Sequence, residues 1–310
     1  MSQKVIIAGG SGLLGRALAR LLAGEGWEVV ILTRDPEKTP LGSDPAAGLI
    51  RAVFWDGKRG GPWTAELEGA NALVNLAGRS INCLFTLENS REILESRLDA
   101  VTALGKALTK CKRPPSVWVQ AGAVGCYGTT GEGLCDEAVP MANDFLAVVC
   151  RQWEEAFQQA CPAEIRPVVL RLGVVLDRAG GAYPPLARLV RRFLGGAAGS
   201  GRQGFSWVHG HDVRRAFRYA ITGPEMSGAY NVCAPHPVTN AEFMAALRLS
   251  LHRPWVPPAP AFLVKLAATH LMQTDPTLVL GGRLCIPQRL LAQGFRFEYP
   301  DLASALEDLG

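Results

Sequence analysis

Short apolar runs alternate along the chain with longer segments in which apolar residues recur every three or four positions. The runs are rich in β-branched residues and lie at 5–7, 29–32, 72–75, 117–119 and 168–170. The periodic segments between them lie at 16–23, 90–108 and 145–160. Such alternation predicts a parallel sheet with helices on both faces. The near-continuous apolar strands fit burial on both sides, so we predict an α/β fold with a doubly wound parallel sheet.

A glycine-rich turn follows the first strand and precedes a helix predicted to begin near residue 13. Its GxxGxxG spacing lets the backbone approach a pyrophosphate, while the helix N-terminus offers free N–H groups. A purely structural glycine turn is the alternative, which the placement at the first strand disfavours. We therefore predict a Rossmann-type dinucleotide site at Gly9, Ser11, Gly12, Leu13, Leu14 and Gly15.

The second strand ends in Thr33 and Arg34, where an NAD-selective site presents an acidic residue to the ribose 2′-hydroxyl. Asp35 stands one position too late for that role. The planar guanidinium of Arg34 is suited to a 2′-phosphate, and Thr33 adds a hydroxyl donor. An arginine here can also be a plain surface residue. The strand tip favours NADP(H) over NAD(H).

Small residues end the next apolar run, in the sequence Asn75, Leu76, Ala77 and Gly78. They allow backbone to pass close to a cofactor, although a simple strand-to-helix turn has the same composition.

On the helix that follows, Glu92 and Arg97 lie within about a turn and a half of each other. Arg97 is a candidate to reach a phosphate, and a surface ion pair with Glu92 or Asp99 is the alternative.

The pattern changes after residue 176, where Gly/Pro-rich loops flank a basic helix. The chain of 310 residues exceeds the usual size of one core. We predict a nucleotide-binding domain from residues 1–176 and 207–235. Residues 177–206 and 236–310 would form a smaller C-terminal lobe on the substrate side.

Composition and charge exclude several classes of protein. Hydrophobic residues make up 48% and charged residues 19%, which is typical of a globular protein. The net charge of +4 is mild and gives no sign of a nucleic-acid partner. We expect no signal peptide and no membrane span, and therefore a cytoplasmic protein. The eight cysteines form no CxxC pair, which favours reduced thiols over a zinc or redox site.

Taken together, the short motifs resemble the atypical extended short-chain dehydrogenases/reductases, and in particular the "epimerase family" proteins sometimes labelled cell-division inhibitors. The resemblance covers nearly the whole chain, including a C-terminal domain of unassigned function at 237–243, 253–254, 287–290 and 294–297. Its other motifs are the glycine turn and residues 75–78, 95–97, 123–128, 145–147, 153–154, 171–176, 199–203 and 207–209. It implies NADP(H) bound through the turn, residues 33–34, 76–77 and 92–97, and Val175 near the end of the sixth strand. It implies no particular substrate.

The chain departs from that group at the catalytic positions. Such enzymes use a Tyr to transfer a proton, a Lys four residues later, and a Ser or Thr after the fifth strand. Here Phe145 stands in the Tyr region and Val149 at the Lys spacing. The hydroxyl-bearing run is replaced by residues that we place against the cofactor, namely Gln120, Ala121 and Gly122.

Any acid/base group must therefore come from elsewhere. Tyr127 is our candidate, because it follows the fifth strand at the cofactor edge of the sheet; a core tyrosine is the alternative. We expect Gln203 and His209 in the substrate pocket. His209 and His211, interpreted as an HxH pair on one strand, lack a third ligand, so we expect no metal.

Two functions remain open. The first is an NADP(H)-dependent oxidoreductase or epimerase acting on an unidentified carbonyl or alcohol. The second is a catalytically silent NADP(H) sensor that acts through a protein partner, which the missing Tyr/Lys pair supports. The family resemblance also suggests a homodimer formed through the helices at 90–108 and 145–160.

Overall fold

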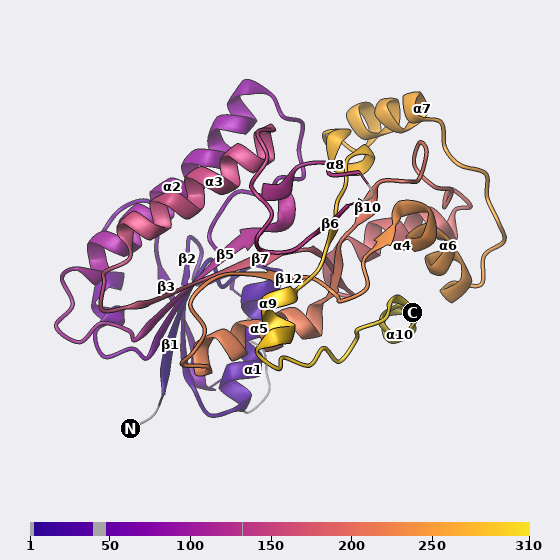
Figure 1. Ribbon diagram of the computed structural model, residues 1–310. Coiled ribbons are helices and arrows are strands. Elements are labelled where there is room, and N and C mark those ends of the chain that lie inside the picture. Colours follow the sequence, from indigo (N-terminus) through magenta and orange to yellow (C-terminus); the bar gives the residue numbers. More distant parts are fainter. Residues whose placement is uncertain (1–2, 40–47, 132) are drawn as a thin grey trace.

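The central feature of the computed structural model is a seven-stranded parallel sheet (Figure 1). The structure describes residues 3–39, 48–131 and 133–310. The strands, in spatial order, are β12 (Gly228–Val232), β7 (Arg166–Leu172), β5 (Val117–Ala123), β4 (Ala72–Asn75), β1 (Lys4–Ala8), β2 (Glu28–Thr33) and β3 (Ile50–Phe54). The order reverses at β1, as in doubly wound folds, and the predicted fold class is confirmed.

Helices cover both faces of this sheet. α2 (Leu87–Leu108) packs beside α3 (Phe145–Ala160) on one face, and α1 (Leu13–Gly24) packs beside α5 (Gly210–Thr222) on the other (Figure 1). The 3₁₀ segment η2 (Pro62–Leu67) contacts α2, and α9 (Gln288–Ala292) contacts β12. The three helices predicted from periodicity are confirmed.

The main core lies between the sheet and these helices. The strands predicted as buried on both faces have almost no exposed apolar surface, as in β1, where Val5 to Ala8 are fully buried. Trp118 meets Phe157 edge to face, with ring centroids 4.9 Å apart. Burying each large apolar side chain contributes roughly 1.5–3 kcal/mol, so this layer dominates the stability of the fold.

A second cluster lies beyond the carboxyl end of β7. Its core is lined by α4 (Tyr183–Arg191), α6 (Asn240–Ser250) and α10 (Leu302–Leu309). The same lobe includes α7 (Ala261–Leu266), the π-helical segment η4 (Ala267–Leu271) and α8 (Thr277–Leu280). Tyr183, Phe243 and Leu306 pack together in its core. The predicted division into two units stays a prediction. Two residues do not follow the predicted division: Leu290 and Phe295 were assigned to the lobe but pack in the main core.

Short strands form three small sheets, of which two join the two units and one lies within the lobe. β8 (Val174–Asp177) lies between β11 (Trp207–His209) and β9 (Gly180–Gly181). The other two sheets pair β10 (Gly204–Phe205) with β13 (Val238–Thr239), and β6 (Leu134–Cys135) with β14 (Leu284–Cys285). The 3₁₀ segment η3 (Val124–Tyr127) follows β5 directly. The sheets that contain β8 and β6 thereby connect the lobe to the nucleotide-binding unit.

Candidate functional site

The glycine turn between β1 and α1 is closely packed on one side and open on the other. Gly9 has a φ of +74°, and a β-carbon there would lie 2.8 Å from the backbone nitrogen of Ala77. A β-carbon on Gly15 would overlap the backbone of Gly10. At Gly12, by contrast, the nearest atom to such a carbon is the Gly9 oxygen at 3.5 Å. Gly9 and Gly15 are therefore needed for the fold, whereas Gly12 leaves room for a ligand.

The first turn of α1 presents unpaired amides beside that space. Gly12 is the exposed N-cap, and no side chain caps the helix. The first helical bond runs from the Arg16 N–H to the Gly12 oxygen at 3.0 Å. The N–H groups of Leu13, Leu14 and Gly15 have no partner within the helix, as is general for a first turn. This arrangement suits an anionic ligand.

The tip of β2 adds a hydroxyl pair and a free cation. Thr33 is buried and donates its hydroxyl to the Ser11 Oγ at 3.0 Å, which ties the strand tip to the glycine turn. Arg34 is exposed and forms no ion pair within the described residues. The next acidic residue, Asp35, is engaged by Lys38 at 3.0 Å. The site therefore has a cation, and no carboxylate, at the strand tip.

Arg97 lies beneath the turn that follows β4. A β-carbon on Gly78 would lie 3.2 Å from its Cγ, and its Nη1 donates to the backbone oxygens of Arg79 and Ile93 at 3.0 and 2.8 Å. The guanidinium carbon stands 5.0 Å from the centre of the Trp153 ring. Burial lowers the pKa of Arg97 from its usual range.

The ion pairs expected as the alternative for Arg97 do not form. Glu92 is exposed and pairs with Arg79, and Asp99 pairs with Lys58 at 3.3 Å. That alternative is wrong, because both carboxylates point to other cations. Within the described residues, the charge of Arg97 is therefore not matched by a carboxylate and can attract an anionic ligand, whereas Glu92 holds the position of Arg79.

Two buried amides join the ends of β4 and β5. Asn75 donates to the Gln120 Oε1 at 2.9 Å and accepts the Ala77 N–H at 3.0 Å. Gln120 in turn donates to the oxygen of Ala121 at 2.9 Å. Both amide side chains are fully buried and bonded to the protein itself. Any cofactor contact from these strand ends would therefore come from the small residues and backbone that follow them.

The positions that carry the reaction in short-chain dehydrogenases hold no acid or base. Phe145 begins α3 and packs against Phe85, with ring centroids 4.9 Å apart. Val149 is buried on the same helix, and Gly122 at the end of β5 is also buried. A β-carbon on Gly122 would lie 3.0 Å from Val169, so no hydroxyl-bearing side chain fits there without displacement.

Tyr127, our sequence-based proton donor, lies in the core. It is 2% exposed and donates its hydroxyl to the Asn231 Oδ1 at 2.8 Å while accepting the Arg171 Nη1–H at 2.9 Å. Burial raises its pKa well above the usual range, and the nearby Arg171 opposes that shift only in part. The geometry corrects the prediction: both hydrogen-bonding roles of this hydroxyl are occupied, and Tyr127 has the structural role that was its alternative.

His209 also has a structural role. It is 5% exposed, caps α5 by accepting the His211 N–H at 3.2 Å on its Nδ1, and stacks on Tyr299 at a centroid distance of 4.0 Å. Its Nε2 lies 3.3 Å from the Asp308 Oδ2. The interpretation of an HxH pair on one strand is wrong, because β11 ends at His209 and His211 belongs to α5.

Gln203 ties the loop after α4 to α8. Its Nε2 donates to the oxygens of Ala198 and Val279 at 2.9 and 3.2 Å. Val175 is half-buried in β8, where its backbone oxygen accepts the Ala182 N–H at 2.9 Å. Contact of either residue with a ligand stays a prediction.

The sequence gives no signal for one further residue at this edge, Arg283. It follows Gly281 and Gly282 in the lobe, and its Nε donates to the backbone oxygen of Gly128, just after η3, at 2.6 Å. A lone arginine after two glycines matches no motif. Only the fold places it beside η3 and near α3.

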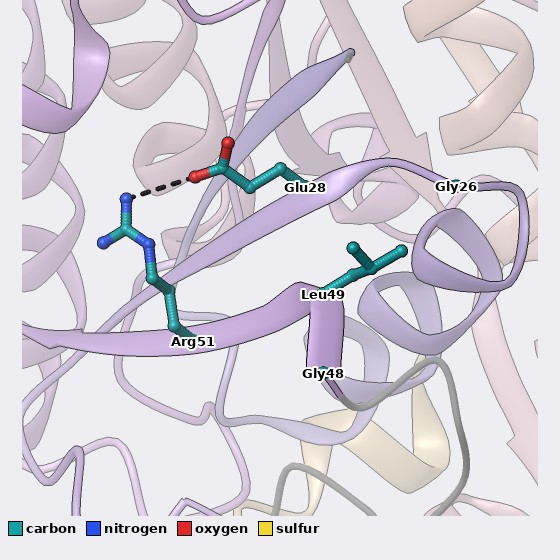
Figure 2. A pocket seen from close by; sticks show the side chains of 5 residues that line it. All are labelled: Gly26, Glu28, Gly48, Leu49 and Arg51. Carbon is teal, nitrogen blue, oxygen red and sulfur yellow. Dashed lines mark hydrogen bonds and ion pairs between the residues drawn. The ribbon is translucent and has the colours of Figure 1, made fainter.

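Two surface hollows lie away from the glycine turn. The first lies where β2 and β3 begin, beside the ion pair between Glu28 and Arg51 (Figure 2). The second lies between α1, α5 and residues 294–296. Ligands of such sheets bind at the carboxyl ends of the strands, so the first hollow, at the amino ends, is not the expected cofactor site. No cluster of three or more potential metal ligands occurs among residues 3–39, 48–131 and 133–310.

Comparison with known proteins bears on this arrangement. The family described as "NAD dependent epimerase/dehydratase family" matches residues 5–233, which is most of the chain. The chain belongs to that family. A second match, "Domain of unknown function (DUF1731)", covers residues 259–309. Both parts of the predicted resemblance are thereby confirmed.

Several relatives of this epimerase/dehydratase protein match over nearly their full length. "Epimerase family protein YfhF" of Bacillus subtilis is 34% identical over 98% of this chain and 97% of its own. "Epimerase family protein SDR39U1" of Homo sapiens is 34% identical over 99% of both chains. The crystal structure of human SDR39U1 (isoform2) with NADPH has a TM-score of 0.85, at 32% identity over 99% of both chains.

A longer structure is also similar, the nucleoside-diphosphate sugar epimerase from Corynebacterium glutamicum. It has a TM-score of 0.78 and 30% identity, and the match covers all of this chain but 59% of that one. In the described part of this chain, no helix has the length and apolar character required to cross a membrane.

Proposed function

We propose that this chain binds NADP(H) in preference to NAD(H), with the pyrophosphate on the first turn of α1 and the 2′-phosphate at Arg34. The observation that carries the proposal is the pairing of an open N-cap at Gly12 with an exposed arginine at the tip of β2. The first supplies amide donors to an anion, and the second supplies a planar fork to a phosphate monoester. The NADPH in the similar human structure supports the same choice.

The remaining contacts of the proposed site come from three strand ends. Ser11 and Thr33 fix the distance between the glycine turn and Arg34 through their hydroxyl pair. Arg97 offers an additional cation below the turn after β4. Each of these groups is held by the fold, so little ordering is needed when a ligand binds.

We further propose an oxidoreductase or epimerase-like reaction on a carbonyl or secondary alcohol. When bound, the nicotinamide would supply or accept a hydride at the edge formed by β5 and α3. The chain itself contributes an apolar wall there, made of the side chains of Phe85, Phe145 and Val149. It places no acid or base on this wall, so the proton must come from solvent or from the substrate.

The second candidate function is a redox sensor that binds NADP(H) without turnover. The observation that favours it is the sequestration of Tyr127, whose hydroxyl is bonded to Arg171 and Asn231 inside the core. The sensor needs the cofactor site and a partner surface, but no proton donor.

One experiment separates the two functions. The purified chain is titrated with NADPH and NADH and is then incubated with NADPH and a panel of aldehydes, ketones and keto acids. NADPH oxidation that depends on both protein and carbonyl supports the enzyme. Tight NADPH binding without oxidation over the whole panel supports the sensor, and failure to bind either nucleotide contradicts both.

A further inference from the structure

Arg283 is fixed by its own backbone at the junction of the lobe and the central sheet. Its N–H donates to the Gly204 oxygen at 3.1 Å, and its oxygen accepts the Ser206 hydroxyl at 2.7 Å. A β-carbon on Gly282 or Gly204 would overlap the facing backbone, so the two segments are in direct contact. Arg283 therefore projects from a rigid base.

Its guanidinium is oriented by one further bond. Nε donates to the Gly128 oxygen at 2.6 Å, just after η3. A β-carbon on Gly125 would lie 3.7 Å from Nη1 and 3.8 Å from the Cβ of Leu146, the neighbour of Phe145. Nη1 thus lies near the first turn of α3, the turn in which short-chain dehydrogenases carry their tyrosine.

Those two nitrogens are unused within the described chain. Neither Nη1 nor Nη2 takes part in a hydrogen bond or ion pair, and neither is among the buried polar atoms without a partner, so both keep contact with solvent. Nη1 and Nη2 of a guanidinium present parallel N–H groups that match two oxygens of one anion.

The charges around this position are unbalanced. Arg171 is matched by Glu154, whose oxygens lie 2.9 Å from its Nε and Nη2. Arg97 and Arg283 have no such partner in the described residues. A β-carbon on Gly125 would lie 3.7 Å from the Arg283 Nη1 and 4.0 Å from the Cys150 Sγ, so Arg283 lies close to α3. A half-buried site with unmatched guanidinium groups attracts an oxyanion more strongly than the same charges on an open surface.

We propose that Arg283 binds a carboxylate or phosphate group of the substrate, so that the substrates of this chain are anionic carbonyl compounds or alcohols. The proposal rests on the proposed function, because it assumes a substrate beside the nicotinamide. Two other arginines of the lobe, Arg188 and Arg202, are poorer candidates for this role. Both of these are exposed, and no contact holds the guanidinium of either one in the described chain.

The test uses the full chain saturated with NADPH, so that the cofactor's own phosphate sites are filled. Malonate and inorganic phosphate are titrated separately by calorimetry against wild type, Arg283→Gln, Arg283→Lys and the control Arg188→Gln. Malonate binding identifies a carboxylate site, and phosphate binding a phosphate site. We expect at least one probe to bind wild type and Arg188→Gln alike, at least tenfold more weakly to Arg283→Lys, and not measurably to Arg283→Gln.

Other outcomes overturn the proposal. Equal probe binding by wild type and Arg283→Gln, or no probe binding to wild type, removes Arg283 as an anion site. A loss of NADPH affinity in Arg283→Gln with an unchanged melting temperature assigns the residue to the cofactor instead. If wild type fails to bind NADPH, the proposed function fails, and the same titrations on the free protein then still decide whether Arg283 binds the probes.

Discussion

Arg171 on β7 and Glu154 on α3 form a two-pronged ion pair inside the core, with Nε and Nη2 each 2.9 Å from a carboxylate oxygen. Both side chains are less than 10% exposed. The same arginine donates to Tyr127, so the pair links the sheet, α3 and η3. Glu154 lies on the same helix as Phe145 and Val149, so loss of the pair should disturb the wall that we assign to the substrate.

Glu154→Gln should lower the free energy of unfolding by about 3–5 kcal/mol, because it leaves the Arg171 charge buried without a counter-charge. The matched control is Glu25→Gln, which breaks the exposed pair with Arg218 and should change stability by about 1 kcal/mol or less. Urea unfolding of the two variants measures both effects. Equal losses of unfolding free energy in Glu154→Gln and Glu25→Gln would contradict the claim that the Arg171–Glu154 pair is a buried pair that stabilises the core.

Tyr127→Phe should destabilise the chain by roughly 1–3 kcal/mol, because the Asn231 oxygen and the Arg171 Nη1 each lose a buried partner. Affinity for NADPH should change little. Chemical unfolding and a cofactor titration of the same samples check the two statements. Unchanged stability together with loss of turnover would restore Tyr127 as a proton donor.

The stability of the chain should fall as the pH drops below about 6.5. Burial lowers the pKa of His209, and the nearby Asp308 opposes this shift only in part. The unfolded chain therefore binds a proton at this residue at a higher pH than the folded chain does. The stabilisation is complete above the unfolded pKa and is lost as the pH falls through the folded pKa.

His209→Asn keeps an N-cap acceptor for α5 and removes the titrating group. Melting temperatures between pH 5 and 8 should fall less steeply in this variant than in wild type. Parallel curves for the two proteins would show that the pH dependence arises elsewhere.

Gly12→Ala and Gly9→Ala should separate ligand binding from folding. Gly12 has a φ of −72°, and no protein atom lies closer than 3.5 Å to its β-carbon position, so alanine should change stability by about 1 kcal/mol or less while obstructing the pyrophosphate. Gly9 has a φ of +74° and touches Ala77, so alanine should destabilise the fold itself. Thermal unfolding and NADPH titration of both variants test this contrast, which would be refuted if Gly12→Ala bound NADPH normally.

Much of this fold could be predicted, because strands that are buried on both faces of a parallel sheet appear in the sequence as unbroken runs of apolar residues. The exception is β3, an edge strand in which Arg51 and Phe54 are exposed, so its sequence lacks that signal. The sequence also did not show that a helix begins directly after His209, because the preceding strand, β11, is only three residues long and its end could not be located from the pattern.

The site was less predictable than the fold for a physical reason. Glycine turns and strand tips are local features, and the sequence displays them directly. The hydroxyl of Tyr127 is bonded to residues 44 and 104 positions away, and Arg283 to one 155 positions away. Such partners are set by tertiary packing, so residue type and spacing alone could not distinguish a core tyrosine from a catalytic one.

The measurement that tests the central claim most directly compares NADPH and NADH affinities in wild type, Arg34→Ala and the control Arg20→Ala, an exposed arginine on α1. Losing a charged hydrogen bond to the 2′-phosphate removes about 1.5–3 kcal/mol, which is on the order of tenfold to a hundredfold in affinity. We predict that Arg34→Ala weakens NADPH binding by that factor, leaves NADH binding unchanged, and that Arg20→Ala resembles wild type. Wild-type protein that binds both nucleotides equally, or an Arg34→Ala variant that keeps the preference for NADPH, would contradict the account.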